Sequence, residues 1–102
     1  MSAVTPRQRF RRNPDVVARE VGGERLLVPL RGASADLRRV FLLNRTAADA
    51  WDLLAAPITL EALSEELGRR HGQPGAALLR DVEELLEELA GRDLLTREVS
   101  AG

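Results

Sequence analysis

The chain has 102 residues, the size of one ordinary domain, and its 44% hydrophobic and 30% charged residues are typical of a globular protein. Its 15 basic residues, all of them arginine, nearly balance 16 acidic residues, so the net charge of −1 provides no overall attraction to nucleic acid or membranes. The absence of cysteine and lysine, with a single histidine, excludes disulfides, thiolate metal sites, Schiff-base catalysis and histidine-pair chemistry. These exclusions favour a binding protein with no cofactor or metal over an enzyme. No signal peptide or long apolar span is visible, which predicts a cytoplasmic protein without a membrane partner.

The chain divides into one domain with two short ends. Residues 1–13, MSAVTPRQRFRRN, have no apolar period and carry four arginines, which predicts a flexible basic N-terminal arm. A single domain is expected over residues 14–97. Residues 98–102 are expected to be a frayed tail.

Three short strands are predicted in the first half of this domain. Val16–Val21 is rich in β-branched residues, and it is followed by Gly22-Gly23 and the apolar run Arg25–Leu30, which together predict a β-hairpin. Pro29 cannot donate a ladder hydrogen bond, so it is expected at a sheet edge or a strand end. Leu37–Leu43 is expected to be a third strand, covered on both faces at its apolar end.

Three helices are predicted to follow. Helical spacing of apolar residues places them at Arg45–Ala55, Leu60–Arg70 and 74–90. Asn44 and Thr59 occupy the N-cap positions of the first two helices, Gly72 supplies a left-handed exit from the second, and Gly91 ends the third. The predicted class is therefore α+β, with three strands before three helices in a single winged-helix-like domain.

The third helix has one strongly apolar stripe and a second apolar shoulder. Leu78, Val82, Leu85 and Leu89 fall within a narrow stripe that predicts the core contact. A shoulder roughly 90° away carries Leu79, Glu83, Leu86 and Ala90. This shoulder is expected either to contact the sheet or the first helix, or to form the wall of an exposed groove.

The remaining polar clusters predict structure rather than catalysis. The opposite side of the third helix carries the carboxylates Asp81, Glu84, Glu87 and Glu88. Consecutive carboxylates on a solvated helix face have no pocket in which to act, and their charge opposes DNA phosphates. His71 is expected to favour the negative end of its helix, and Trp51 is expected in the core.

Four segments together resemble the PqqD family, the peptide chaperones of pyrroloquinoline quinone biosynthesis, and the wider class of RiPP recognition elements, which serve ribosomally made, post-translationally modified peptides. The segments are LLVPLRG (26–32), VFLLNRTAADAW (40–51), ITLEALSEEL (58–67) and DVEELLEELAGRDLL (81–95). Each motif consists mainly of core residues. Their order and spacing over residues 14–96 carry the resemblance.

The resemblance implies three strands followed by three helices and a protein that is not an enzyme. Family members bind the leader segment of a precursor peptide and present it to a modifying enzyme, often a radical-SAM protein. The leader adds as a strand beside the third strand, in the groove between it and the third helix. Transferred to this chain, the implied peptide-binding residues are Leu37, Arg38, Arg39, Val40, Phe41, Leu42 and Leu43 on the strand, and Leu79, Glu83, Leu86 and Ala90 on the helix.

Two departures from the family pattern leave the pathway open. The insertion GASAD before the third strand and the basic arm point to another peptide pathway at least as much as to the quinone. Arg38 and Arg39 suggest an acidic residue in the leader. A Leu86→Asp variant is expected to lose peptide binding and keep its fold.

Two other functions are compatible with the pattern. One is a winged-helix-like DNA-binding or transcription-associated module, and the other is a simple dimerisation or interaction domain that uses the shoulder leucines. An open strand edge allows either a monomer or a strand-swapped dimer.

Overall fold

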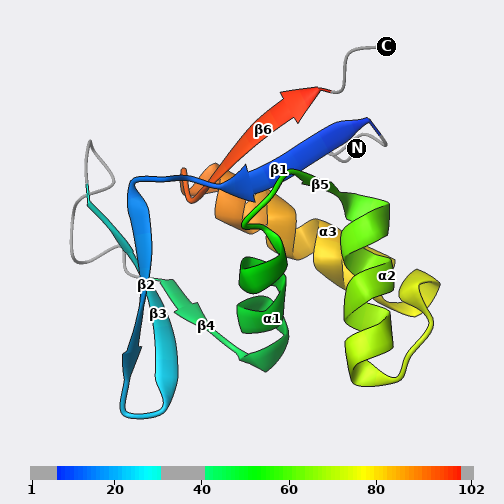
Figure 1. Ribbon diagram of the computed structural model, residues 1–102, viewed down its shortest axis with the longest axis horizontal. Coiled ribbons are helices and arrows are strands. Elements are labelled where there is room, and N and C mark those ends of the chain that lie inside the picture. The colour runs from blue at the N-terminus through cyan, green and yellow to red at the C-terminus, as the bar shows by residue number, and fades with distance from the viewer. Residues whose placement is uncertain (1–6, 31–40, 100–102) are drawn as a thin grey trace.

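The computed structural model describes residues 7–30 and 41–99. Along the chain, the described elements are β1 (Gln8–Arg12), β2 (Val16–Val21), β3 (Glu24–Pro29), β4 (Phe41–Leu43), α1 (Arg45–Leu53), β5 (Ile58–Thr59), α2 (Leu60–His71), α3 (Gly75–Gly91) and β6 (Leu95–Val99). They form an α+β fold in which a first sheet, β5-β1-β6, lies across one end of the helices and a second sheet, β2-β3-β4, projects beside α1 (Figure 1). The predicted α+β class is confirmed.

The first sheet includes segments that the sequence analysis assigned to flexible ends. β1 is the central strand and pairs antiparallel with both β5 and β6. The prediction of a flexible arm is therefore wrong for Gln8–Arg12, and the prediction of a frayed tail is wrong for Glu98 and Val99, which pair with Arg9 and Gln8. These residues form a strand because side chains alternate between its two faces. Phe10 packs in the core at 0% exposure, while its arginine neighbours face solvent.

The second sheet contains the predicted hairpin. β2 and β3 pair in register from Val16↔Pro29 to Val21↔Glu24, and both residues of the Gly22-Gly23 turn have positive φ. Glycine adopts that conformation without a steric penalty, as a two-residue hairpin turn with positive φ requires. Pro29 is the last residue of β3, as expected for a proline in a strand. The third predicted strand is confirmed over Phe41–Leu43, whereas its first four residues lie outside the described part of the chain.

The helices begin and end close to the predicted positions. The Asn44 side chain accepts a hydrogen bond from the Ala47 N–H at 2.8 Å, and Thr59 caps α2 in the same way through the Ala62 N–H at 3.2 Å. Gly72 has a φ of 67° and ends α2 in the left-handed conformation. α1 ends at Leu53, two residues earlier than predicted, because Leu54 already leaves helical geometry.

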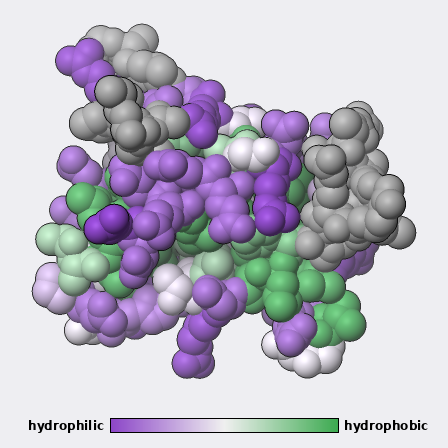
Figure 2. All heavy atoms as spheres, turned by 180° about the vertical axis from the view of Figure 1, so that it is seen from behind, coloured by the Kyte–Doolittle hydropathy of each residue, from purple (hydrophilic) through white to green (hydrophobic). Residues whose placement is uncertain are grey.

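The core lies between the helices and the inner faces of the two sheets. Its largest fully buried members come from β1, β3, all three helices and the residue that follows α1, and include Trp51, Phe10, Leu27, Leu54, Leu63, Leu67, Leu86 and Leu89. His71 ends α2 with its Nε2 at 2.9 Å from the Asp49 carboxylate of α1, without hydrogen-bond geometry. None of the described helices is long and apolar enough to cross a membrane. Viewed from behind, the molecule also shows hydrophobic residues at its surface, at the lower right over the β2–β3 hairpin (Figure 2).

Candidate peptide-binding edge and pocket

β4 is the terminal strand of the second sheet. It pairs with β3 through Arg25↔Leu43, Leu26↔Leu42 and Leu27↔Phe41, and no described strand pairs with its other edge. An edge strand presents backbone N–H and C=O groups that another extended segment can pair with. The edge of β4 is therefore the place where this sheet can accept a further strand.

Side chains of β4 alternate between the two faces of the sheet. Leu43 is buried and Phe41 is half-buried on the face toward α1, whereas Leu42 is 54% exposed on the opposite face. The Arg92 guanidinium, just after α3, lies over the Phe41 ring at 5.0 Å from its centroid. This cation–π contact fixes the end of α3 beside the start of β4.

A pocket of about 480 Å³ lies where β4 ends, between the first turn of α1 and the first half of α3. Its apolar lining comes from Ala47 on α1 and from three α3 residues, namely Leu78, Val82 and Leu85. Its polar lining includes Asn44, Thr46, Asp81 and Glu84. The pocket combines apolar walls with hydrogen-bonding and acidic groups, which suits one or two side chains of a bound segment.

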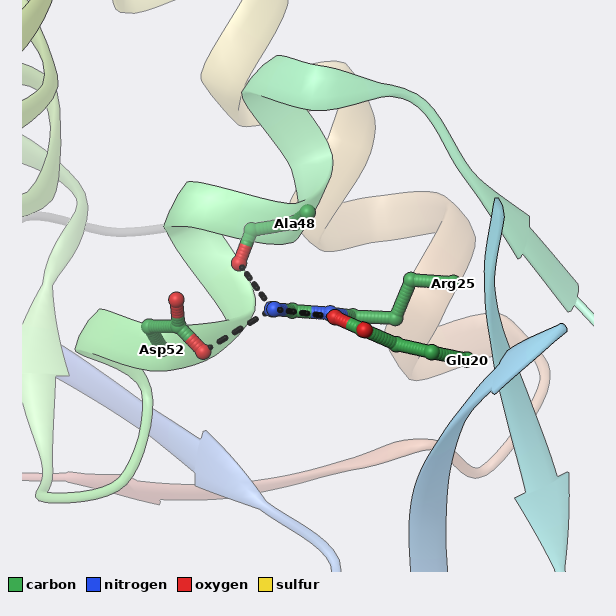
Figure 3. A network of polar contacts seen from close by, with 4 residues as sticks. All are labelled: Glu20, Arg25, Ala48 and Asp52. Carbon is green, nitrogen blue, oxygen red and sulfur yellow. Dashed lines mark hydrogen bonds and ion pairs between the residues drawn. The ribbon is translucent and has the colours of Figure 1, made fainter. Parts of the chain in front are cut away.

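A polar network holds the second sheet against α1. Arg25 on β3 lies at 3.0 Å from the Asp52 carboxylate and at 3.4 Å from the Ala48 carbonyl oxygen, both on α1 (Figure 3). It also bonds Glu20 across the hairpin at 3.3 Å. The hydrogen bond to Glu20 raises the pKa of Arg25, and the negative charge of Asp52 raises it further. Arg25 thus joins the hairpin to the helix that borders the pocket.

We expect Arg25→Ala to destabilise the fold by about 1 kcal/mol, because a partly exposed ion pair contributes little more than that. The free energy of unfolding from urea denaturation measures the loss, and a double-mutant cycle with Asp52→Ala isolates the pair. Arg11→Ala, an exposed arginine of β1, is the matched control and should change stability by less than about 0.5 kcal/mol. A zero coupling energy between Arg25 and Asp52 would contradict the role given to this network.

Among the described residues, none of those predicted on the strand or on the helix lines the pocket at the end of β4. Phe41, Leu42 and Leu43 lie on the edge strand, and the predicted strand residues Leu37, Arg38, Arg39 and Val40 lie outside the described part of the chain. Leu86 is fully buried in the core cluster, so the expectation that it forms the wall of an exposed groove is wrong for this residue.

The rest of the predicted helix shoulder turns away from the pocket. Leu79, at 38% exposure, Glu83 and Ala90 lie roughly 150° around α3 from the pocket residues Asp81 and Leu85. The pocket thus uses the opposite shoulder of the helix.

Sequence reasoning missed Leu78, Asp81 and Leu85 as candidate site residues. The two leucines were assigned to the core stripe, and they are only half-buried at its edge. Asp81 was assigned to a solvated face. The apolar stripe of this helix has two borders, one with Leu79 and one with Leu85, and either border could have been predicted to line a binding site.

The comparisons with known proteins agree with this fold. The family model described as coenzyme PQQ synthesis protein D (PqqD) matches residues 24–95. Among solved structures, the chain is similar to the solution NMR structure of the PqqD truncation of Methylobacterium extorquens PqqCD, with a TM-score of 0.72 and 20% sequence identity. The match covers 93% of this chain and 96% of that one, which is described as a functional and stand-alone RiPP recognition element. A search of the curated proteins found no match.

These findings first define the class, an α+β domain with the PqqD fold in which β4 is the last strand of its sheet among the described residues. Because the family model covers more than half of the chain, the protein belongs to the PqqD family. The resemblance stated from the sequence is thereby confirmed. Among the described residues, no group of three or more histidine, cysteine, aspartate or glutamate side chains is arranged to hold a metal ion.

Proposed function

We propose that the protein is a RiPP recognition element that binds the leader segment of a ribosomally made precursor peptide. The leader adds as a strand to the edge of β4 that pairs with no other described strand, and it places a side chain in the pocket between α1 and α3. The observation that carries this proposal is the junction of the two features, since the pocket opens at Asn44, immediately after the last residue of the edge strand. Membership of the PqqD family and the recognition-element description of the Methylobacterium structure support it.

Strand addition explains how so small a domain can hold a peptide. Each backbone hydrogen bond contributes on the order of 1 kcal/mol net. A handful of these bonds and one or two apolar anchors reach about −8 kcal/mol, a micromolar affinity, after the ordering cost of the peptide. Backbone pairing is indifferent to sequence, so selectivity falls to the side chains around the pocket, above all Leu78, Asp81 and Leu85.

In this proposal the protein does no chemistry itself. It holds the leader while a separate modifying enzyme, of which a radical-SAM protein is one class, acts on the rest of the precursor. The proposal includes no cofactor, nucleic acid or membrane as partner. The solvent side of α3 disfavours DNA in particular, because Asp81, Glu84 and Glu88 are exposed there and would oppose phosphates. The peptide product is not specified, and pyrroloquinoline quinone is one candidate.

The test uses fluorescent synthetic peptides that cover the N-terminal halves of the short reading frames encoded beside the gene. We expect one of them to bind saturably with micromolar affinity in an anisotropy titration, and the amide resonances of Phe41–Leu43 to shift on binding. Asp81→Arg and Leu85→Glu should each weaken binding by at least about tenfold, because both residues line the pocket. Asp81 is exposed, so its replacement leaves the core intact.

Leu79→Glu is the matched control, a change on the opposite shoulder of the same helix that should leave peptide affinity unchanged. Circular dichroism establishes that each variant is folded. Loss of binding in Leu79→Glu without loss in Asp81→Arg or Leu85→Glu would refute the pocket. Absence of binding by every peptide, with all variants folded, would refute leader recognition.

A further inference from the structure

The second sheet has an outer face that is largely apolar. Because cross-strand partners share a face, the register of β2, β3 and β4 places seven side chains on the side away from α1. This outer sheet face consists of Val17, Arg19, Val21, Glu24, Leu26, Val28 and Leu42. Five of the seven are apolar, and Val21 and Leu42 are 60% and 54% exposed. The hydrophobic surface over the hairpin in Figure 2 belongs to this sheet.

The outer face of the first sheet is polar, in contrast to that of the second sheet. The register of β1, β5 and β6 places on its outer side the residues Arg9, Arg11, Thr59, Thr96 and Glu98. Each of them is polar or charged, as expected for an antiparallel sheet with one face in water. The second sheet departs from this pattern at five positions, of which Val21 and Leu42 are exposed and the other three are partly exposed, and apolar surface of this kind marks an interaction site.

The charges on the outer sheet face indicate what covers it. Arg19 lies beside Leu26 and Glu24 lies beside Val21, so that one cation and one anion border the apolar residues. In the described part of the chain, neither Arg19 nor Glu24 makes an ion pair or a side-chain hydrogen bond. A face with one unpaired charge of each sign is complementary to itself.

We propose that the outer sheet face binds a second copy of this chain in a two-fold dimer. The two-fold axis lies between the two sheets and passes over Leu26 and Val21. It places Arg19 of each copy opposite Glu24 of the other, which gives two equivalent ion pairs, and it buries the apolar residues of both faces between the sheets. The strands of the two sheets then cross at a steep angle, as in orthogonal sheet packing. The edge of β4 points along the sheet rather than out of it, so neither copy covers the β4 edge of the other in this dimer.

This inference is tested by sedimentation of the full chain over a wide concentration range. We expect the wild-type mass to rise from one chain to two. Leu42→Glu should weaken the association by on the order of 100-fold, because it places a charge against the apolar partner face. Leu79→Glu, an exposed leucine on α3, is the matched control and should dimerise like the wild type.

Charge reversal gives a sharper test that leaves the apolar residues in place. Arg19→Glu and Glu24→Arg should each weaken the homodimer about tenfold, because each creates two like-charge contacts. An equal mixture of the two variants, one of them labelled with ¹⁵N, should form a heterodimer in native mass spectrometry, since both contacts are then attractive. Arg9→Glu on the first sheet serves as the charge control.

Three results would overturn the inference. The first is a wild-type chain that stays monomeric at every concentration. The second is a dimer that Leu42→Glu leaves unchanged, and the third is a mixture of the two reversed variants that associates no better than either variant alone. None of these measurements uses a peptide, so failure of the dimer is distinguishable from failure of leader recognition.

Discussion

A chain that begins at Asn13 is expected to be unfolded. Such a truncation removes β1, the central strand of the first sheet, and leaves β5 and β6 without a common partner. It also removes Phe10, which is fully buried in the core. The backbone N–H of Arg12 donates to the Leu54 carbonyl at 2.9 Å, so the deletion exposes the end of α1 as well. Because domains of this size are stable by roughly 5–15 kcal/mol, losing a central strand exceeds the available stability.

Single substitutions in β1 distinguish the contribution of its buried side chain to stability from that of its exposed charges. Phe10→Ala should cost about 3–5 kcal/mol, the usual loss for a buried phenylalanine. Arg9→Ala, one residue earlier and exposed, should change stability by less than about 0.5 kcal/mol. Circular dichroism and urea unfolding give all three values. A truncated chain that still unfolds cooperatively near the wild-type midpoint would show that the first sheet does not depend on β1.

The second large effect concerns Leu86 in α3. Leu86 is 0% exposed and belongs to the core cluster, so Leu86→Ala should cost about 2–5 kcal/mol, and Leu86→Asp should leave the protein unfolded because it buries an unpaired charge. The sequence alone led to the opposite expectation for Leu86→Asp, a folded protein without peptide binding. Burial is the reason for the reversal.

Leu79 supplies the comparison, since it is the same residue type on the same helix. At 38% exposure, Leu79→Ala should cost less than about 1 kcal/mol in the same urea experiment. Peptide affinity is then measured for Leu86→Ala at a temperature where it is folded. Equal stability losses at the two positions would show that the shoulder of α3 is uniformly buried or uniformly exposed, which contradicts the structure.

Local signals predicted much of the fold. The Gly22-Gly23 turn sets a two-residue hairpin, and both glycines adopt the positive φ that such a turn requires. Asn44 and Thr59 cap their helices through bonds to residues three positions later, so their role is visible in a short segment. These interactions join neighbouring residues, and their geometry depends little on the rest of the chain.

The first sheet gave no comparable signal. QRFRR has a single apolar residue, and its strand conformation depends on pairing with β6, more than eighty residues away along the chain. The alternation of Phe10 with arginines is consistent with a strand, but five residues with one apolar side chain among them also fit a basic arm. Only the partner strands distinguish the two.

The candidate site was predicted in part. Edge strand residues Phe41–Leu43 and the involvement of α3 follow from the sequence and the family resemblance. Which shoulder of α3 borders the pocket depends on how the helix is rotated about its own axis. Packing of Val82, Leu86 and Leu89 into the core fixes that rotation, and it leaves Leu78, Asp81 and Leu85 toward α1.

By itself the sequence determined the order of the hairpin, edge strand and helices, the caps that bound them, the family, and the absence of thiol and amine chemistry. Turns, caps and apolar periods depend on residues close together in the chain, so they do not depend on how the elements pack against one another. The tertiary structure alone decided that β1 is a central strand, that Leu86 is interior, and that one sheet presents polar residues outward while the other presents valines and leucines. Each of these depends on contacts between residues far apart in the chain, where the side that a residue faces is set by what packs against it.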